Sequence, residues 1–320
     1  MTKAGTGMKV REEVLRLLME EGTLSGGKTA ESLGVSRTAV WKAVEELRRE
    51  GIAIGSVHGG GYRLEDRDRV LSTDAVRAFL RPDKDMDVIF AGSRVDSTNT
   101  EALRHLRDGA VPPFVLIAGE QTRGRGRKGR SFYSPRGGLY MTVALPGMIP
   151  VTALTGLTAH AALCVCFALE EIARLKPGIK WINDIFLDGK KIAGILTEAD
   201  VDAESGDARN IRVGIGINTG FGEAAEDCPG MAFLGIPALR PALAARIAAD
   251  TAAYDTERGL DTGAYKSRSV TLGHRVRLIS GGREHEGLAV GVDGNGALIL
   301  DEDGRKNVLL SGDMVRDIRS

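Results

Sequence analysis

The chain has 320 residues, of which 42% are hydrophobic, and this length and composition predict two or three globular domains with sizeable cores. Lysine plus arginine and aspartate plus glutamate both number 43, so no global field attracts a polyanionic partner, and any nucleic-acid surface must be local. The sequence shows no apolar run of about 18 residues and no apolar signal core at its N-terminus. The protein is therefore expected to stay in the cytoplasm.

The three cysteines predict neither a metal site nor a disulfide framework. Cys164 and Cys166 lie one residue apart inside an apolar helical stretch, which is not a spacing of metal ligands, and Cys228 leaves the count odd. We expect buried free thiols.

Residues 1–65 predict a small helical unit. Apolar side chains recur at helical spacing over 8–20, and a second short helix is expected over 28–33. Ser36 is placed to cap a third helix over 37–50. This succession of helix, turn and helix is typical of the helix-turn-helix.

A hairpin follows the third helix, because strand-like runs over 52–57 and 62–64 flank a His-Gly-Gly-Gly turn. The unit is therefore predicted to be a winged helix, whose third helix can reach phosphates and base edges in a major groove. The candidates for DNA contact are Ser36, Arg37, Thr38, Trp41 and Lys42, with Glu45 and Arg48 also facing outward. A winged helix used only for protein contacts remains an alternative, because residues 1–65 hold ten basic residues against nine acidic ones.

A polar linker over 65–69 leads to a larger unit, in which strand-like and helix-like runs alternate from residue 86 onward. This alternation predicts a mixed α/β domain whose sheet is backed by helices. The expected strands are 88–91, 115–118 and 139–145, and the expected helices are 100–107 and 155–175.

The run Asp96-Ser97-Thr98-Asn99 opens the first of these helices. Thr98 followed by Glu101 fits a capping box, which would make the run a simple helix start. Its spare hydroxyls and amide could also hold a small polar head group, and the two interpretations are compatible.

Residues 119–130, GEQTRGRGRKGR, are the strongest local signal of chemistry. Five of the eight positions from Arg123 to Arg130 are cationic, and the intervening glycines let the backbone approach a ligand closely. Because the segment leaves the end of a strand, where α/β folds bind ligands, it is predicted to bind phosphate. A solvated turn or a nucleic-acid patch would have a similar composition.

An Asp-Gly pair between two strand-like runs predicts a two-residue type I′ hairpin. In the ideal register Asp184 lies opposite Ala193. Strand alternation then puts Lys180, Asp184 and Lys191 on one face, where two ammonium groups and a carboxylate converge. Asn183 would point the other way, so it shares this site only if the strand bulges or ends beside it.

A further strand, 211–218, alternates isoleucine and valine on one face with Arg212, Gly214, Gly216 and Asn218 on the other. The two glycines leave a shelf on which a flat ligand could lie, although a bulge or a close helix approach would also require them. An Ala-rich helix is expected over 238–258. Closely spaced turns and short strands after it, at 275–279, 287–291 and 297–300, predict a small β-barrel or sandwich.

Taken together, these motifs resemble biotin protein ligase in its bifunctional form, which is also the biotin operon repressor. The motifs are DSTN at 96–99, GRGRKGR at 124–130, KWIND at 180–184, KKIAGIL at 190–196 and GIGIN at 214–218. The resemblance implies an α+β multidomain chain. It divides into a winged helix-turn-helix at 1–65, a mixed α/β catalytic domain of the biotin/lipoate-ligase type at 66–268, and an SH3-like β domain at 269–320.

The resemblance implies an ATP-dependent ligase that works in two steps, with Mg²⁺ as cofactor. Biotin and ATP give biotinyl-5′-AMP and pyrophosphate, and a lysine of the biotin carboxyl carrier protein of acetyl-CoA carboxylase then takes the biotinyl group. It further implies that the adenylate-bound form is a homodimer that binds operator DNA and represses the biotin-synthesis genes. No membrane is involved.

The resemblance also assigns roles to single residues. Lys191, Arg127 and Lys180 would be catalytic. Biotin would contact Ser97, Thr98, Asn99, Gln121, Gly124, Arg125, Gly126, Arg127, Lys191, Gly194, Gly214 and Gly216. ATP would contact Arg130, Phe132, Lys180, Asn183 and Asn218.

Physical chemistry agrees with this assignment, because a carboxylate that attacks an α-phosphate needs cations between the two anions. The chain departs from the family at Ile182, where proline is common, and at Phe132, where tryptophan is common. The role of Asp184 stays open between metal positioning, activation of the carrier lysine and an ion pair with Lys180. A lipoate ligase and a DNA-binding regulator that only senses a ligand are the alternative functions.

Overall fold

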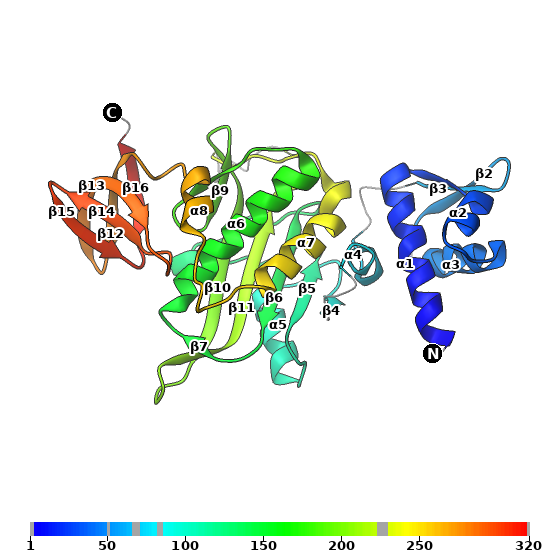
Figure 1. Cartoon of the computed structure of the whole chain (residues 1–320), viewed down its shortest axis with the longest axis horizontal. Coiled ribbons are helices and arrows are strands. Elements are labelled where there is room, and N and C mark those ends of the chain that lie inside the picture. The colour runs from blue at the N-terminus through cyan, green and yellow to red at the C-terminus, as the bar shows by residue number, and fades with distance from the viewer. Residues whose placement is uncertain (1–2, 50–51, 66–70, 82–85, 223–229, 319–320) are drawn as a thin grey trace.

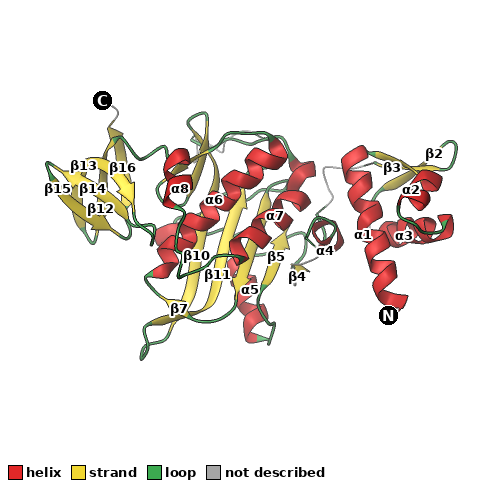
Figure 2. Cartoon of the chain, in the orientation of Figure 1, coloured by secondary structure: helices red, strands yellow, loops and turns green. Residues whose placement is uncertain are grey.

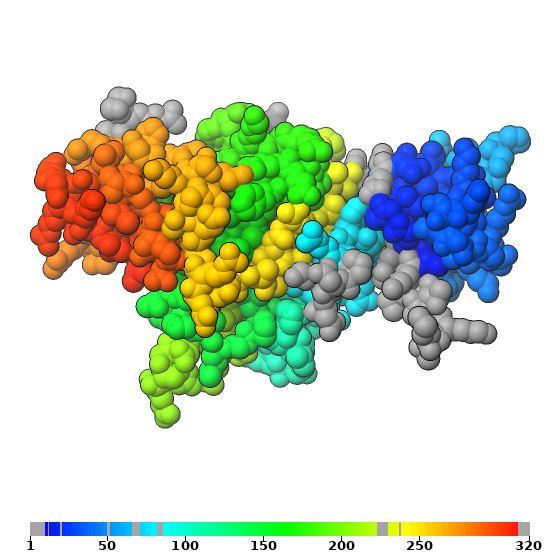
Figure 3. Space-filling view, in the orientation of Figure 1, coloured from blue at the N-terminus to red at the C-terminus, as the bar shows by residue number. Residues whose placement is uncertain are grey.

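The computed structural model describes residues 3–49, 52–65, 71–81, 86–222 and 230–318, so most of the predicted linker at 65–69 lies outside the described residues. The chain forms three units that lie in a row, with the N-terminus in the unit at one end and the C-terminus in the unit at the other (Figure 1). The two outer units flank a larger central one, in which helices are stacked on a sheet (Figure 2). In the space-filling view the three units form one elongated body (Figure 3). The predicted α+β multidomain fold is confirmed.

The N-terminal unit is a winged helix whose sheet has the strand order β1-β3-β2. Its elements are α1 (Lys3–Glu21), β1 (Thr23–Ser25), α2 (Gly26–Ser32), α3 (Arg37–Arg49), β2 (Ile54–Val57) and β3 (Gly61–Leu64). Ser36 caps α3 as predicted, because its Oγ accepts the amide of Ala39 at 3.1 Å. Helix α1 begins earlier than predicted. Strand β1 is missing from the sequence prediction because three residues cannot show an alternation.

Helix α4 (Thr73–Arg77) lies between the N-terminal and the central unit. Ala75 belongs to the core of the winged helix, whereas the next residue, Val76, belongs to the core of the central unit. Arg11 of α1 also pairs with Asp74 at 2.5 Å, and both side chains are mostly buried. Helix α4 therefore joins the two units by packing and by an ion pair.

The central unit is built on a mixed sheet of eight strands with the order β4-β5-β6-β11-β10-β9-β8, and β7 pairs with β11 beside this path. Strands β4 and β5 are parallel, and the other described neighbours are antiparallel. The strands are β4 (Asp87–Phe90), β5 (Phe114–Ala118), β6 (Leu139–Leu145), β7 (Ile149–Pro150), β8 (Gly178–Lys180), β9 (Asp184–Leu187), β10 (Lys190–Val201) and β11 (Asp207–Ile217).

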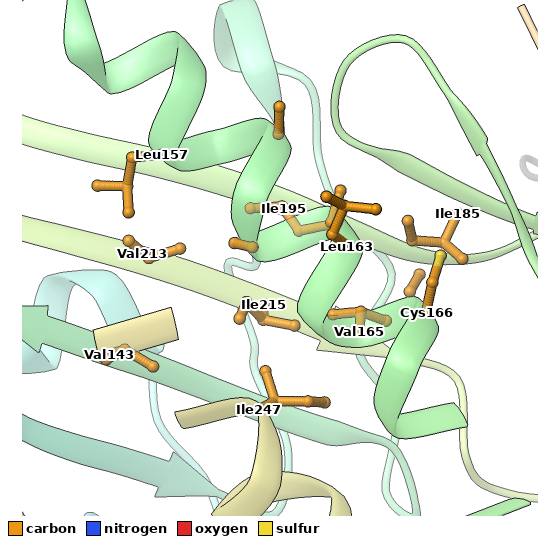
Figure 4. Packing of buried hydrophobic residues seen from close by; sticks show 14 of the residues in the cluster. Val143, Leu157, Leu163, Val165, Cys166, Ile185, Ile195, Val213, Ile215 and Ile247 are labelled. Atoms are coloured by element: carbon orange, nitrogen blue, oxygen red, sulfur yellow. The ribbon is translucent and has the colours of Figure 1, made fainter. Parts of the chain in front are cut away.

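Helices cover both faces of this sheet. Helices α6 (Ala153–Ala173) and α7 (Arg240–Ala252) pack on one face, and α5 (Thr98–Arg107) packs on the other (Figure 1). Figure 4 shows Leu163 of α6 and Ile247 of α7 packed over Ile215 of β11. By length and composition α6 could cross a membrane, but burial against the sheet accounts for its apolar character.

The alternation predicted for β11 is confirmed, since its isoleucine and valine side chains are buried under α6 and α7. The predicted helix over 238–258 is too long, because α7 ends at Ala252. A short helix, α8 (Thr262–Arg268), then precedes the last unit.

The C-terminal unit is a small all-β domain with one five-stranded antiparallel sheet in the order β15-β14-β13-β12-β16. The strands are β12 (Arg275–Ser280), β13 (Arg283–Val292), β14 (Leu298–Glu302), β15 (Arg305–Leu309) and β16 (Asp313–Ile318). Trp181 fixes this unit to the central one, because its buried indole Nε1 donates to the carbonyl of Gly296 at 2.9 Å. The predicted β-rich C-terminus is confirmed, although β15 and β16 are absent from the sequence prediction.

Candidate active site

A cavity of about 140 Å³ lies between the first turn of α5, the loop after β5 and the strands β9, β10 and β11. We call it the central cavity, and we call residues 119–130 the Arg/Gly loop. The cavity is lined by Ser97, Thr98, Asn99, Gln121, Arg125, Gly126, Arg127, Arg130, Ser131, Phe132, Asn183, Asp184, Lys191, Gly194, Ile195, Leu196, Gly214, Ile215 and Gly216. The structure thus brings together most of the residues predicted to bind biotin and ATP.

Three side chains, Ser97, Thr98 and Gln121, form a polar corner of the cavity. The amide and the hydroxyl of Thr98 donate to Gln121 Oε1 at 2.8 and 3.1 Å. Gln121 Nε2 in turn donates to Ser134 Oγ at 2.9 Å. These bonds fix the orientation of Gln121 and place hydroxyl and amide groups at a buried helix start.

The capping box predicted from Thr98 and Glu101 is wrong. The residue at the N-cap of α5 is Ser97, whose side chain makes no cap bond, and the hydroxyl of Thr98 is engaged by Gln121 instead. Glu101 does not return to the helix start but pairs with Arg104 at 2.5 Å. Asp96 accepts the amide of Ser97, and hydrogen bonding from Arg104 lowers the pKa of the Asp96 carboxyl.

The Arg/Gly loop is held in shape by its own backbone. The amide of Gly126 donates to the carbonyl of Arg130 at 2.7 Å, and the amide of Phe132 donates to the carbonyl of Gly124 at 2.8 Å. At Gly124 a Cβ would lie 2.4 Å from the carbonyl oxygen of Phe132, so only glycine fits there. Gly124 therefore gives the loop its shape. It was predicted to contact biotin, but it does not line the cavity.

Lys191 projects from β10 into the cavity. Its ammonium pairs with Asp184 Oδ1 at 2.6 Å and lies 5.9 Å from the ring centre of Phe132. Asp184, whose role the sequence left open, therefore forms an ion pair with Lys191. The pair makes the position of the ammonium definite, which a flexible lysine alone would not.

The predicted register of the β9-β10 hairpin is correct at the turn but wrong further on. Both turn residues, Asp188 and Gly189, have positive φ, as a type I′ turn requires. Beyond it Ile192 is an extra residue, so Asp184 pairs with Gly194 rather than with Ala193. A bulge of this kind depends on the neighbouring strands and leaves no local mark in the sequence.

Asn183 reaches the cavity because β9 begins only at Asp184, so strand alternation does not fix its direction. Its Nδ2 donates to the carbonyl of Ile195 at 2.9 Å, and its Oδ1 accepts from Arg127 Nη1 at 3.3 Å. Asn183 thereby links the Arg/Gly loop to β10.

Lys180 lies opposite Asp184 in the β8-β9 pair and shares its face of the sheet, as predicted, but it does not line the central cavity. Its ammonium lies 5.7 Å from the ring centre of Phe186, in a separate hollow at the sheet edge formed by β8. Asn218 also lies outside the lining. It is 1% exposed, and its Nδ2 donates to the carbonyl of Ala232 at 3.1 Å, which ties β11 to the chain that follows.

The glycine shelf on β11 exists, but protein side chains lie over it. A Cβ at Gly214 would meet Asn99 Oδ1 at 2.4 Å, and a Cβ at Gly216 would meet the ring of Phe132 at 2.3 Å. Close approach of side chains therefore explains both glycines.

Asn99 lies over Gly214 and is held on three sides. Its Nδ2 donates to the carbonyl of Leu196 at 3.1 Å and to Glu198 Oε2 at 2.9 Å, while its Oδ1 accepts from Thr142 at 2.8 Å. Glu198 is absent from the sequence predictions. Strand alternation could have predicted that Glu198 lies near the site, because Gly194, Leu196 and Glu198 alternate along β10 and so share one face.

The outward face of α3 carries the residues predicted to contact DNA. Ser36, Arg37, Thr38, Trp41 and Lys42 are all exposed, and Trp41 keeps 51% of its surface accessible. Together with the wing and the start of α2 this face borders a hollow of about 420 Å³. Arg48 was expected to face outward as well. Its guanidinium instead donates to the carbonyl of Ile54 at 2.8 Å and so fixes the β2-β3 hairpin, which is the wing, to α3.

Cys164 and Cys166 are buried free thiols, as predicted. Burial raises the pKa of the Cys166 thiol to about 12 and moves the pKa of Cys164 in the same direction. Cys228 lies outside the described residues.

Three family models match the chain in the order of its three units. An HTH domain matches residues 10–63, the biotin/lipoate A/B protein ligase family matches residues 91–218, and the biotin protein ligase C terminal domain matches residues 271–316. The chain is 31% identical over 305 residues to the bifunctional ligase/repressor BirA of Salmonella typhimurium, a match that covers 91% of this chain and 92% of that relative.

The chain belongs to the biotin/lipoate A/B protein ligase family. It is 37% identical over 212 residues to the bifunctional ligase/repressor BirA of Bacillus subtilis, where the match spans 65% of each chain. Among solved structures it is similar to the biotin protein ligase from Aquifex aeolicus in complex with biotin and ATP. The TM-score is 0.57 and the identity 26%, and the match covers 74% of this chain and all (100%) of that one.

The two departures from the family motifs have definite places in the structure. Ile182 is 3% exposed and packs in the core beside Trp181, and the peptide bond between them is cis. Phe132 lies against Gly194 and Gly216 inside the cavity. An aromatic ring therefore remains at the position where the family commonly has tryptophan.

Proposed function

We propose that this chain activates biotin with ATP and transfers the biotinyl group to a lysine of a biotin carboxyl carrier protein, that of acetyl-CoA carboxylase. The observation that carries the proposal is the shared lining of the central cavity. Lys191 and three arginines of the Arg/Gly loop, Arg125, Arg127 and Arg130, line the same cavity as the polar corner of Ser97, Thr98 and Gln121.

The first step joins two anions. A carboxylate oxygen of biotin attacks the α-phosphorus of ATP, and pyrophosphate leaves with the electron pair of the broken P–O bond. Lys191 supplies positive charge between the two reacting groups, and Arg127 and Arg130 supply it around the phosphates. Asp184 keeps the Lys191 ammonium in place through their 2.6 Å ion pair.

The polar corner suits the ureido ring of biotin, which offers two N–H donors and one acceptor oxygen. Gly126, Gly194 and the backbone around Arg125 leave room for the acyl chain. In the second step the carrier lysine amine attacks the acyl carbon of the mixed anhydride, and AMP leaves. The Arg/Gly loop excludes water, which would otherwise hydrolyse the same bond.

The residues proposed to contact ATP in the cavity are Arg130, Phe132 and Asn183. Lys180 and Asn218 lie outside this lining, and we keep them as proposed contacts of ATP at the edge of the site. No group of three or more His, Cys, Asp or Glu side chains that could hold a metal ion occurs among the described residues. Magnesium would enter bound to the phosphate oxygens of ATP, as part of the substrate.

ATP–pyrophosphate exchange with purified protein tests the ligase proposal, with biotin and lipoate added separately. Exchange with biotin alone is expected, because the C-terminal unit matches the biotin protein ligase C terminal domain. Exchange with lipoate alone would select a lipoate ligase instead. Exchange with neither acid would point to a regulator that only senses a ligand.

The winged helix supports a second activity, repression of biotin-synthesis genes by an adenylate-bound homodimer. The exposed row on α3, which holds Arg37, Thr38, Trp41 and Lys42, carries this part, although Trp41 is bulky for a position that reads bases. Binding to DNA from upstream of biotin-synthesis genes should tighten when biotin and ATP are both present. Equal affinity with and without them would exclude the adenylate as corepressor.

We also propose that the chain divides into three domains, at 1–65, 66–268 and 269–320. We further propose that the protein works in the cytoplasm, where ATP, the carrier protein and the operator DNA occur together. Helix α4 lies just beyond the first boundary and contacts both neighbouring units. Limited proteolysis tests these boundaries, since cleavage between folded units should release fragments that end near them.

A further inference from the structure

One carboxylate beside the central cavity has two partners that belong to different parts of the site. Glu198 Oε2 accepts from Asn99 Nδ2 and from Arg125 Nη2, in each case at 2.9 Å. Asn99 stands in the first turn of α5, Arg125 in the Arg/Gly loop, and Glu198 on β10. A single atom thus connects three segments that are far apart in the sequence.

The two partners of Glu198 differ in burial. Asn99 is 3% exposed, and its other polar contacts, to Leu196 and Thr142, fix it on the sheet. Arg125 keeps 47% of its side chain exposed and stands in a glycine-rich segment. The bond to Glu198 therefore ties Arg125 of the Arg/Gly loop to a side chain that is fixed on the sheet, in addition to the contact between Arg127 and Asn183.

We infer that Glu198 is a positioning residue, which holds the Arg/Gly loop over the central cavity through Arg125 and shields the bound acyl-adenylate from water. Glu198 is not among the residues that line the cavity, so it acts through Arg125 rather than on the reacting atoms. This inference rests on the proposed function for the identity of the intermediate. The loop contact itself requires no ligand.

Charge explains why a carboxylate stands here. The Arg/Gly loop has five cationic residues within eight positions, so these like charges repel one another. The Glu198 side chain is 27% exposed. Solvent therefore screens its attraction to Arg125 less than it would screen the attraction in a fully exposed ion pair. The neighbouring carboxylate, Asp184, is already paired with Lys191.

The first test uses trypsin on the unliganded full chain, because the loop offers several cleavage sites. Glu198→Ala should raise the rate of cleavage after Arg123 and Arg127 by about tenfold, since it removes a charge-assisted hydrogen bond and an ion pair. Glu198→Gln should raise the rate less, by about threefold, because its amide oxygen can still accept both bonds.

Glu101→Ala is the matched control, since Glu101 has 25% exposure and an ion pair with Arg104, and it does not line the cavity. Cleavage in the loop should match that of the unchanged chain in this control. Equal rates for Glu198→Ala and Glu101→Ala would overturn the inference. If Glu198→Ala does not fold, Arg125→Met should open the loop to the same extent by removing the other partner.

The second test measures how long the adenylate survives without a carrier. With biotin and ATP present, Glu198→Ala should release or hydrolyse the adenylate about tenfold faster and should raise KM for biotin by a larger factor than it lowers kcat. Arg125→Met should do the same, and the double variant should be no worse than either single one. Multiplying effects would refute a shared action.

The two proposals fail separately. Absence of biotin-dependent exchange in the unchanged chain would refute the proposed function, while the tryptic rates would still decide whether Glu198 holds the loop.

Discussion

Substitution of Gly214 by alanine tests the account of the glycine face on β11. A Cβ at Gly214 would lie 2.4 Å from Oδ1, 2.8 Å from Cγ and 2.9 Å from Nδ2 of Asn99. None of these atoms can move without breaking the bonds to Leu196, Glu198 and Thr142. At about 1 kcal/mol for each lost bond, the displacement costs about 3 kcal/mol.

Alanine is more favourable than glycine in a strand by about 0.5–1 kcal/mol, which leaves a net loss of about 2 kcal/mol for Gly214→Ala. In an Asn99→Ala background the clashing atoms are gone, and the same substitution should be neutral or slightly stabilising. The coupling between the two positions should therefore be about 2–3 kcal/mol.

Urea unfolding measures this coupling through tryptophan fluorescence. The chain has two tryptophans, so a Trp41→Phe background leaves Trp181 as the reporter, and Trp181 is 5% exposed at the junction of the central and C-terminal units. If Gly214→Ala destabilises both backgrounds equally, to within about 0.5 kcal/mol, contact with Asn99 does not explain the glycine.

Three further predictions concern other parts of the chain. Lys191→Ala should reduce biotin-dependent pyrophosphate exchange at least about 100-fold, with the circular dichroism unchanged; normal exchange would refute its role. Removal of residues 1–65 should abolish DNA binding and leave ligation measurable, whereas loss of ligation would show that the winged helix supports the active site. Cys164 and Cys166 should resist iodoacetamide at pH 8 until the chain unfolds, as followed by mass spectrometry. Burial raises their pKa values, so this contribution to stability is present below the unfolded thiol pKa of about 8.5 and is lost as the pH rises toward 12. Labelling of the native chain would contradict that burial.

The sequence by itself determined the features that depend on neighbouring residues in the chain. Ser36 could be assigned as a cap because capping needs only a side-chain oxygen and the next few amides. The Asp188-Gly189 turn was predictable because a type I′ turn selects residues that tolerate positive φ. The alternation of β11 was predictable because a strand buried on one face must repeat every two residues.

Tertiary structure decided the features that depend on which strands become neighbours. The bulge at Ile192 shifts the register of β9 against β10, so Asp184 lies opposite Gly194 rather than Ala193. No local pattern encodes such a shift, since it follows from packing on both sides of the strand.

The same holds for the polar atoms around the cavity. The sequence around Thr98 matches a capping motif. In the structure, however, the Thr98 hydroxyl donates to Oε1 of Gln121, which lies in a loop distant in sequence. Nothing in the sequence around Glu198 distinguishes it from other strand residues. Only the fold brings Asn99 Nδ2 and Arg125 Nη2 to within 2.9 Å of its Oε2. Residue types and spacing determined which groups the site could contain. The tertiary structure decided which of these groups form hydrogen bonds with each other. A buried polar side chain needs a hydrogen-bond partner, and the fold determines which partner lies within reach.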